Sequence, residues 1–313
     1  MTFAMIVAGL LLLLAGGEAL VRGAVALALR LGVSPLMIGL TVVGFGTSMP
    51  ELVTSIQAGA VGSPGIAIGN IVGSNIANIL LILGIAALLA PIAINRGALL
   101  RDGAFMIGSA LLFAGLCYAG RLGAFAGVTL LASLAGYLLL LWRQERSKPA
   151  SELDTQVSEA VAITRGSLAY ALALTLGGIA VLVLGARLLV FGSIDLARDL
   201  GISETVIGLT VVAIGTSLPE LATSVVAAIR KQPDVAFGNI VGSNIFNVLG
   251  IAGVLALVTP VDVPAPMLAT DIPIMLAVSA ALVFVAWTGS RIVRLEGALL
   301  LAGFGAHQML TWL

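Results

Sequence analysis

Two glutamates, Glu51 and Glu220, lie inside otherwise apolar stretches, and their carboxylates are the strongest candidates for chemistry in this chain. Each belongs to one copy of a repeated motif, GTSMPEL at residues 46–52 and GTSLPEL at residues 215–221. An ionisable group at membrane depth costs free energy, so it is read first as functional. Carboxylates are hard oxygen ligands that suit calcium or sodium rather than soft metals. The pair therefore predicts a cation site.

A second repeated motif follows each glutamate. It reads GNIVGSNIAN at residues 69–78 and GNIVGSNIFN at residues 238–247, and 9 of its 10 positions match. Around the glutamates, 13 of 17 positions match between residues 39–55 and their partners 169 residues later. The constant offset indicates that the chain contains two copies of one structural unit.

A proline stands beside each glutamate and predicts a break in the helix. Pro50 has no amide hydrogen, and its ring clashes with the carbonyl of Gly46, four residues earlier. We expect free carbonyls near residues 44–47, which lipid does not tolerate unless they face protein, water or an ion. Thr47 shares a helical face with Glu51, four residues on. The second copy repeats the arrangement with Thr216, Pro219 and Glu220.

The composition identifies the class of protein that must position these groups. Of 313 residues, 60% are hydrophobic and 10% are charged, against about 25% charged in soluble domains. This excess predicts an all-α polytopic membrane protein whose partner is the lipid bilayer. The zero net charge gives no sign of nucleic acid, and no protein partner is implied. With one cysteine, Cys117, and one histidine, His307, neither an intrachain disulfide nor a multi-histidine metal centre is possible.

Ten apolar stretches have the length of a membrane-spanning helix. The first is expected to be a retained helix, because it lacks a charged start and a small-residue cleavage signature. A polar linker at residues 143–165 separates a first repeat at 1–142 from a second at 166–313. The ten stretches lie near residues 3–29, 35–60, 66–92, 102–119, 122–142, 167–191, 204–229, 235–258, 269–287 and 292–312.

Five spans in each half predict inverted repeats, because the second copy enters the bilayer from the opposite side. The positive charges give the orientation. With both termini outside, 12 of the 15 lysines and arginines lie in inner loops, and only Arg121, Arg187 and Arg198 lie outside. The linker is then cytoplasmic, and the protein is a multi-pass protein of the cell (inner) membrane.

Inversion brings the two motif copies together near the midplane. Ser74 and Asn78 lie on one helical face, as do Ser243 and Asn247, because four residues separate the members of each pair. Asn70 and Asn239 are expected to cap the broken helices or to pack between them. The predicted cage contains Glu51, Glu220, Asn78 and Asn247, with hydroxyls from Thr47, Thr216, Ser48, Ser217, Ser74 and Ser243. Two carboxylates balance one divalent cation or several sodium ions.

These duplicated motifs resemble the alpha repeats of the cation/calcium exchanger superfamily, and most of all those of prokaryotic sodium/calcium exchangers. The resemblance implies ten helices, alternating access and sodium-driven calcium transport, with Ca²⁺ and Na⁺ as transported ions and no cofactor. It also implies that the carbonyls of Gly44 and Ala213 join the ligands. Long glycine-rich first and sixth helices are candidates for the moving element.

One position departs from a branch of this superfamily. Some members carry aspartate where this chain has Asn247, a pattern typical of potassium-dependent exchangers, and the neutral Asn78 and Asn247 argue against potassium dependence. The alternatives are a proton/calcium or other divalent cation antiporter of the same superfamily, and a cation channel. An enzyme is not expected, since the chain has neither HExxH nor paired aspartates within its spans.

Overall fold

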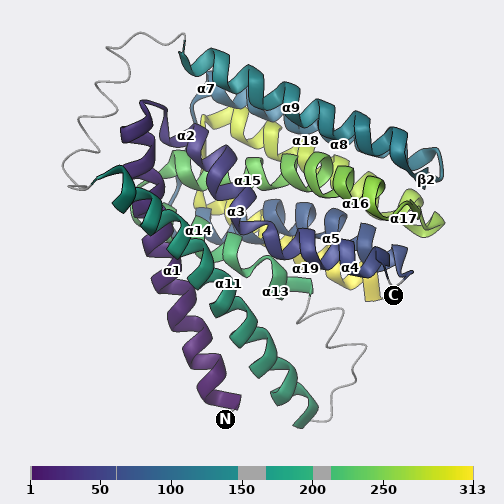
Figure 1. Cartoon of the computed structure of the whole chain (residues 1–313), viewed down its shortest axis with the longest axis horizontal. Helices are drawn as coiled ribbons and strands as arrows, with labels where there is room; N and C mark the ends of the chain where they lie inside the picture. The colour runs from purple at the N-terminus through teal and green to yellow at the C-terminus, as the bar shows by residue number, and fades with distance from the viewer. Residues whose placement is uncertain (1, 61, 147–166, 200–212, 313) are drawn as a thin grey trace.

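The computed structural model describes residues 2–60, 62–146, 167–199 and 213–312 (Figure 1). The first half contains α1 (Thr2–Leu31), α2 (Pro35–Ile38), η1 (Gly39–Val43), α3 (Gly44–Thr47), α4 (Met49–Ala60), α5 (Pro64–Ala77), η2 (Asn78–Ile82), α6 (Leu83–Leu89), β1 (Ile92–Ala93), α7 (Arg96–Ala98), η3 (Leu99–Gly103), α8 (Ala104–Tyr118), β2 (Arg121–Leu122) and α9 (Ala124–Arg146). The second contains α11 (Leu168–Asp199), α13 (Ala213–Thr216), α14 (Leu218–Ile229), α15 (Pro233–Ile245), η5 (Phe246–Ile251), α16 (Ala252–Val258), β3 (Val261–Asp262), α17 (Ala265–Ala269), α18 (Asp271–Gly289), β4 (Arg291–Ile292) and α19 (Arg294–Trp312).

The described parts of the predicted apolar stretches are mainly helical, with a break at Ser48 and at Ser217 and short strands at some of the stretch ends. α9 continues to Arg146, so the first four residues of the expected linker at 143–165 are helical. The rest of that linker lies outside the described residues, as do residues 204–212 of the seventh stretch. The fourth stretch begins earlier than expected, because Asn95 caps α7 by accepting hydrogen bonds from the amides of Gly97 and Ala98.

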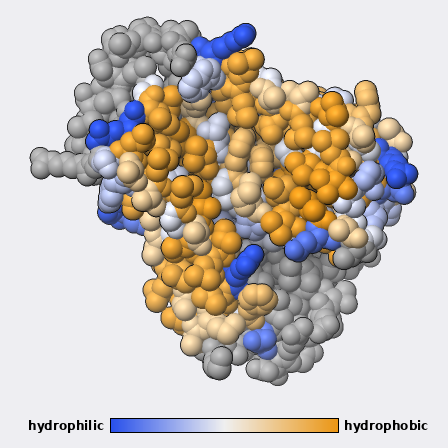
Figure 2. All heavy atoms as spheres, in the orientation of Figure 1, coloured by the Kyte–Doolittle hydropathy of each residue, from blue (hydrophilic) through white to orange (hydrophobic). Residues whose placement is uncertain are grey.

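The described residues form a membrane protein. Seven of their helices are long and apolar enough to cross a bilayer, or eight if Leu36–Thr47 and Met49–Ala60, bent by 43°, form one span. Large apolar side chains such as Phe125 and Phe284 are exposed. In Figure 2 most of the visible face is hydrophobic, and the few hydrophilic residues lie mainly toward its edges. The all-α polytopic class is therefore confirmed, whereas the count of ten crossings stays a prediction.

Four two-residue strands, which no pattern in the sequence predicts, join the halves. β1 pairs with β4, and β2 pairs with β3, both antiparallel. Each pair takes one strand from each half of the chain. Their hydrogen bonds satisfy backbone groups in the short turns that follow the helices.

The two longest helices, α1 and α11, lie side by side and extend away from the other helices (Figure 1). Glycines allow their backbones to touch. A Cβ atom at Gly178 would lie 2.6 Å from the amide nitrogen of Leu20, and one at Gly16 would lie 2.8 Å from that of Leu182. Such backbone contact indicates that α1 and α11 form one tightly packed pair.

One ion-pair cluster connects this pair of helices to the rest of the molecule. Glu18 of α1 accepts a hydrogen bond from Arg22 one helical turn on, as the four-residue spacing predicts. It also binds Arg230 at the end of α14, with nitrogen–oxygen distances of 2.6 and 2.8 Å. Glu18 therefore ties α1 to the helix that carries Glu220.

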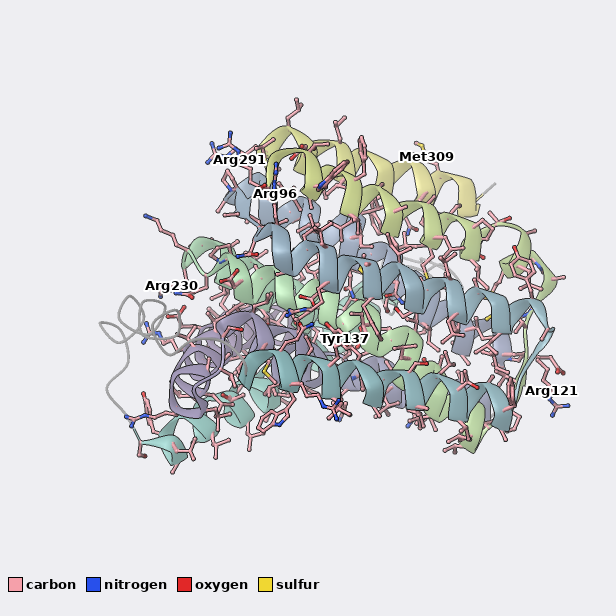
Figure 3. All side chains as sticks on the ribbon, turned by 90° about the horizontal axis from the view of Figure 1, so that it is seen from above. Arg96, Arg121, Tyr137, Arg230, Arg291 and Met309 are labelled. Atoms are coloured by element: carbon pink, nitrogen blue, oxygen red, sulfur yellow. The ribbon has the colours of Figure 1, made fainter. Side chains whose placement is uncertain are left out.

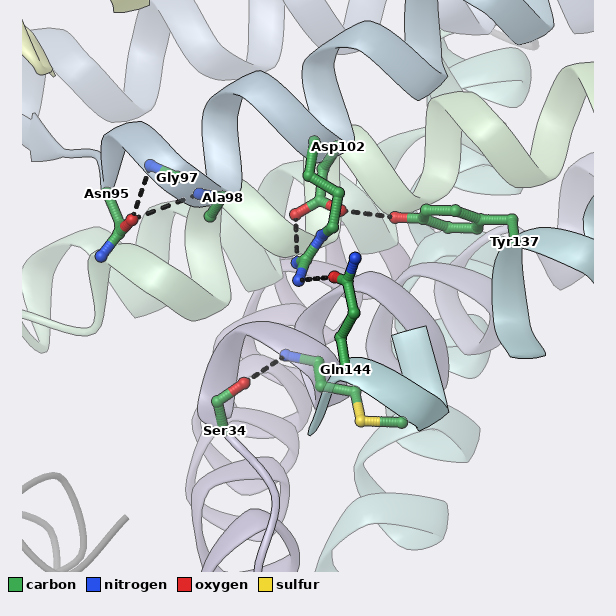
Figure 4. A network of polar contacts seen from close by, with 9 residues as sticks. Ser34, Asn95, Gly97, Ala98, Asp102, Tyr137 and Gln144 are labelled. Atoms are coloured by element: carbon green, nitrogen blue, oxygen red, sulfur yellow. Dashed lines mark hydrogen bonds and ion pairs between the residues drawn. The ribbon is translucent and has the colours of Figure 1, made fainter. Parts of the chain in front are cut away.

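A buried carboxylate fixes α9 against η3 (Figure 4). Asp102 has no exposed surface and accepts two hydrogen bonds from Arg101, at 2.6 and 2.7 Å. The Tyr137 hydroxyl donates to the same carboxylate at 3.2 Å, and Arg101 also donates to Gln144. Because the arginine fork and the tyrosine satisfy it, this acidic group has a structural explanation.

Candidate functional site

The helices that carry the two glutamates break at equivalent serines. Ser48 separates α3 from α4, and Ser217 separates α13 from α14. Their backbone angles are nearly equal, with φ −82° and ψ 9° at Ser48 and φ −87° and ψ 7° at Ser217. The breaks that the prolines predict are therefore present in both copies, and each places a serine hydroxyl one turn before a glutamate.

The carbonyl of Gly44 corrects one expectation. The sequence predicts bare carbonyls at this break, but the Gly44 oxygen accepts hydrogen bonds from the Ser48 amide at 3.2 Å and from the Ser243 hydroxyl at 3.0 Å. The Thr47 hydroxyl also contacts it, at 3.3 Å. One donor, the Ser48 amide, is local because the chain continues as a tight turn, and the other, Ser243, comes from the opposite repeat.

The serine of each repeat serves the glutamate of the other. Ser48 donates to Oε1 of Glu220 at 2.8 Å, and Ser217 donates to Oε1 of Glu51 at 3.1 Å. Both carboxyl groups are 1% exposed. Ser217 also lies 3.4 Å from the Ser74 hydroxyl, which brings α5 to the same site. The two copies of the motif therefore meet face to face, as inverted symmetry predicts.

Two asparagines hold the broken helices in place. Asn239 donates to the Glu220 carbonyl at 3.2 Å and to Ser224 at 2.8 Å, and its Oδ1 contacts the Thr47 hydroxyl at 3.2 Å. Asn70 does the same with the Glu51 carbonyl, Ser55 and Thr216, at 3.1, 2.9 and 3.5 Å. Each asparagine thus joins a helix of its own repeat to the hydroxyl of the opposite one.

These asparagines pack between the broken helices, which is one of the two arrangements that the sequence predicts. In the sequence, both asparagines occupy the second position of the repeated motif GNIVGSN, and the two copies are 169 residues apart. Ser55 and Ser224, as well as Asn244, were missed altogether. Asn244 accepts a hydrogen bond from Asn78 at 3.0 Å.

Asn78 and Asn247 begin or lie within π-helical turns, η2 and η5, at equivalent positions. Both side chains are 1% exposed. A π turn shifts the side chains that follow it around the helix, and such turns are frequent at functional sites. η5 contacts α4, which carries Glu51, and η2 contacts α14, which carries Glu220. The two asparagines therefore line the same region as the carboxylates.

Within the described part of the chain, four buried side-chain oxygens of this region have no hydrogen-bond partner. They are one Oε2 of each glutamate and one Oδ1 of each asparagine, from Glu51, Glu220, Asn78 and Asn247. A buried oxygen without a donor costs free energy and calls for an explanation such as a bound ion. All four are hard ligands of the kind that calcium and sodium prefer.

The other predicted ligands occupy the walls of this region. Thr47, Ser48, Ser217 and Ser243 are buried, Ser74 is 5% exposed, and Thr216 is half-buried. Ala213 is the first residue of α13. Among the described residues, no three acidic, cysteine or histidine side chains lie close enough together to hold a metal ion, so the carboxylates of this region would need neutral oxygens to complete a cation site.

Glycines bring α15 against η1 and α3. A Cβ atom at Gly44 would lie 2.9 Å from the Ser243 amide nitrogen, and one at Gly238 would lie 2.9 Å from the Leu36 carbonyl oxygen. At Gly242 a Cβ would collide with the carbonyl of Leu40. The backbones must be this close for the Ser243 hydroxyl to reach Gly44.

We expect Asn239→Ala to destabilise the protein more than Asn70→Ala. Asn239 is fully buried and Asn70 is half-buried, so more of the released hydroxyl and carbonyl groups stay without water in the first variant. Leaving buried groups unpaired costs about 1–3 kcal/mol. Thermal unfolding in detergent measures the order of the two effects, and equal melting temperatures would contradict the assignment of Asn239 as a cross-link.

The chain is similar to known proteins over nearly its whole length. The profile of the sodium/calcium exchanger protein family matches residues 1–143 and 170–312. Sodium/calcium exchanger MaX1 of Methanosarcina acetivorans is 36% identical, with 96% of this chain and 95% of that protein aligned. Inner membrane protein YrbG of Escherichia coli is also 36% identical, over 99% and 97%. The solved structure of sodium-calcium exchanger NCX_Mj soaked with Na⁺ and Sr²⁺ superimposes with a TM-score of 0.85, at 31% identity over 98% and 97% of the chains.

Proposed function

We propose that this cation antiporter, which belongs to the sodium/calcium exchanger protein family, exchanges sodium for calcium. The carrying observation is the set of four buried, unpartnered oxygens on Glu51, Glu220, Asn78 and Asn247. Two carboxylates balance a divalent cation. Sodium ions can balance the same charge with help from the surrounding hydroxyls, so the two ions compete for one site.

The ligand set is the one that the duplicated motifs predict. Glu51 and Glu220 supply the charge, and the two asparagines supply neutral oxygens. The serine hydroxyls donate to the carboxylates in the described structure, and they can turn their lone pairs toward a cation instead. The remaining proposed ligands are Thr47, Thr216, Ser74, Ser243 and the carbonyls of Gly44 and Ala213.

We further propose ten crossings in two inverted repeats, residues 1–142 and 166–313, in the cell (inner) membrane with both termini outside. The arginines support this orientation. Figure 3 places Arg96, Arg230 and Arg291 at one end of the molecule and Arg121 at the opposite end. The positive-inside rule assigns the first three to the inner side and Arg121 to the outer side.

Access to the site would alternate by movement of α1 with α11. Their glycine contacts make them one unit, and the ion pair between Glu18 and Arg230 is a bond between that unit and the remaining helices. Movement of α1 past α14 by a few ångströms must break this pair. A disulfide that fixes α1 to α14 should therefore stop exchange, and continued transport after complete crosslinking would contradict this proposal.

Calcium uptake into proteoliposomes tests the proposed exchange. Sodium-loaded vesicles diluted into sodium-free buffer should take up calcium, and vesicles with equal sodium on both sides should not. If a proton gradient drives uptake without sodium, the protein is a proton/calcium antiporter instead. Single-channel currents in planar bilayers would indicate a channel. Potassium should make no difference, because both asparagine positions are neutral.

A further inference from the structure

The structure contains a cavity of about 280 Å³ that ends at the proposed ion site. Thr54 and Gln57 of α4 line it from one side, and Arg187 of α11 lines it from another. Gly215 and Thr216 of α13 also line it. Thr216 is followed directly by Ser217, which donates to the Glu51 carboxylate. The cavity therefore borders the proposed site, and the exposed Arg187 forms part of its wall.

A positively charged side chain, that of Arg187, lines this cavity. Arg187 is exposed, and no ion-pair partner for it exists among the described residues. Its guanidinium is protonated at every physiological pH. A path for cations is normally lined by oxygens or acidic groups, so an arginine without an ion-pair partner in the described part of the chain is a departure that calls for an explanation.

The internal repeat allows Arg187 to be compared with its equivalent residue in the first half of the chain. Arg187 and Glu18 stand 169 residues apart, so they occupy equivalent positions on α11 and α1. Glu18 is neutralised by Arg22 and Arg230 where α1 meets α14. The neighbouring Gly17 packs closely against α14, because a Cβ there would lie 3.2 Å from the Val226 side chain. Glu18 is therefore held in an ion pair, whereas Arg187 lines a cavity and has no ion-pair partner among the described residues.

Resting on the proposed exchange, we propose that Arg187 determines ion specificity at this mouth by repelling divalent cations more strongly than monovalent ones. The electrostatic energy of an ion in the field of one fixed charge is proportional to the ion's own charge. Calcium therefore feels twice the repulsion of sodium. The effect weakens calcium binding from this side and favours its release, while sodium entry is affected less.

A charge series at position 187 tests this assignment. For a charge on the order of 10 Å from the ion, Arg187→Gln should lower the KM for calcium on the cavity side about threefold, and the KM for sodium by less than about twofold. Arg187→Glu should double the effect on a logarithmic scale. Arg187→Lys should behave like the wild type. The shifts should shrink as ionic strength rises, because salt screens the field.

Arg121→Gln is the matched control. It removes the same charge from β2, where Arg121 is exposed and lies 3.7 Å from Asp262 rather than in the cavity. Its KM values should equal those of the wild type. Equal shifts for calcium and sodium, or a lysine variant that behaves like the glutamine variant, would overturn the electrostatic assignment and leave Arg187 a packing role.

A second measurement does not depend on transport. Cys117 is buried and is the single native cysteine, so a Cys117→Ala background can carry one new thiol at Gln57. With Arg187 present, that thiol should react faster with an anionic thiosulfonate reagent than with a cationic one, and Arg187→Gln should remove the preference. A wild type that does not exchange ions refutes the proposed function, whereas an unchanged reagent preference refutes the role of Arg187.

Discussion

Glu220→Gln is expected to abolish calcium binding and exchange while leaving the fold intact. Glutamine keeps the shape of the side chain and an oxygen that can accept from Ser48, so the 2.8 Å hydrogen bond survives. What disappears is one of the two negative charges in the buried site. Removing one partner of a buried charge pair costs about 3–5 kcal/mol, which corresponds to a loss of affinity of roughly 10²–10⁴-fold.

Calorimetric titration of calcium and exchange in proteoliposomes measure this loss. Glu51→Gln should behave alike, because Ser217 serves its carboxylate as Ser48 serves Glu220. Glu296→Gln is the control: it also removes a glutamate charge, but from the first turn of α19, where the side chain accepts from the Val293 amide. Full exchange activity in either site variant would refute the proposal that the carboxylates hold the ion.

Gly242→Ala is expected to reduce exchange by at least about tenfold and to lower the melting temperature. The added Cβ meets the backbone of Leu40, which cannot rotate away as a flexible side chain would. Overpacking of this kind costs about 1–3 kcal/mol. Because α15 and η1 must separate, the Ser243 hydroxyl loses its 3.0 Å contact with Gly44, and the wall of the site shifts.

Gly108→Ala provides the comparison for this packing argument. Gly108 lies within α8, is exposed, and has open space where its Cβ would stand. Alanine should be neutral or slightly stabilising there, because it is the better helix former. If Gly242→Ala exchanges ions at the wild-type rate with an unchanged melting temperature, close backbone packing is not required at this position.

Much of the site could be predicted because its information is local. Pro50 and Pro219 predicted the helix breaks, because a missing amide hydrogen disrupts a helix whatever surrounds it. The apolar stretches predicted the helices, because length and hydropathy are properties of the segment itself. The duplicated motifs then indicated that both glutamates belong to one site.

Other features escaped prediction because they depend on neighbours in space. The π turns at Asn78 and Asn247 give no signature in hydropathy, and the strand pairs are only two residues long. The expectation of a bare carbonyl at Gly44 was wrong, because Ser243, 199 residues later, donates to it. No sequence pattern links two residues so far apart, so this contact could not be predicted.

The sequence alone determined the class of protein, the duplicated unit and the residue types of the ion site, because composition, spacing and proline chemistry act within a segment. The tertiary structure decided which groups meet. Ser48 donates a hydrogen bond to Glu220, and Ser217 donates one to Glu51, so each serine binds the glutamate of the other repeat. Because the two motifs are nearly identical, the sequence cannot tell this arrangement from one in which each serine binds the glutamate of its own repeat. It also separated Glu18 from Arg187, which are equivalent in the repeat: packing gives Glu18 an ion pair and leaves Arg187 in a cavity.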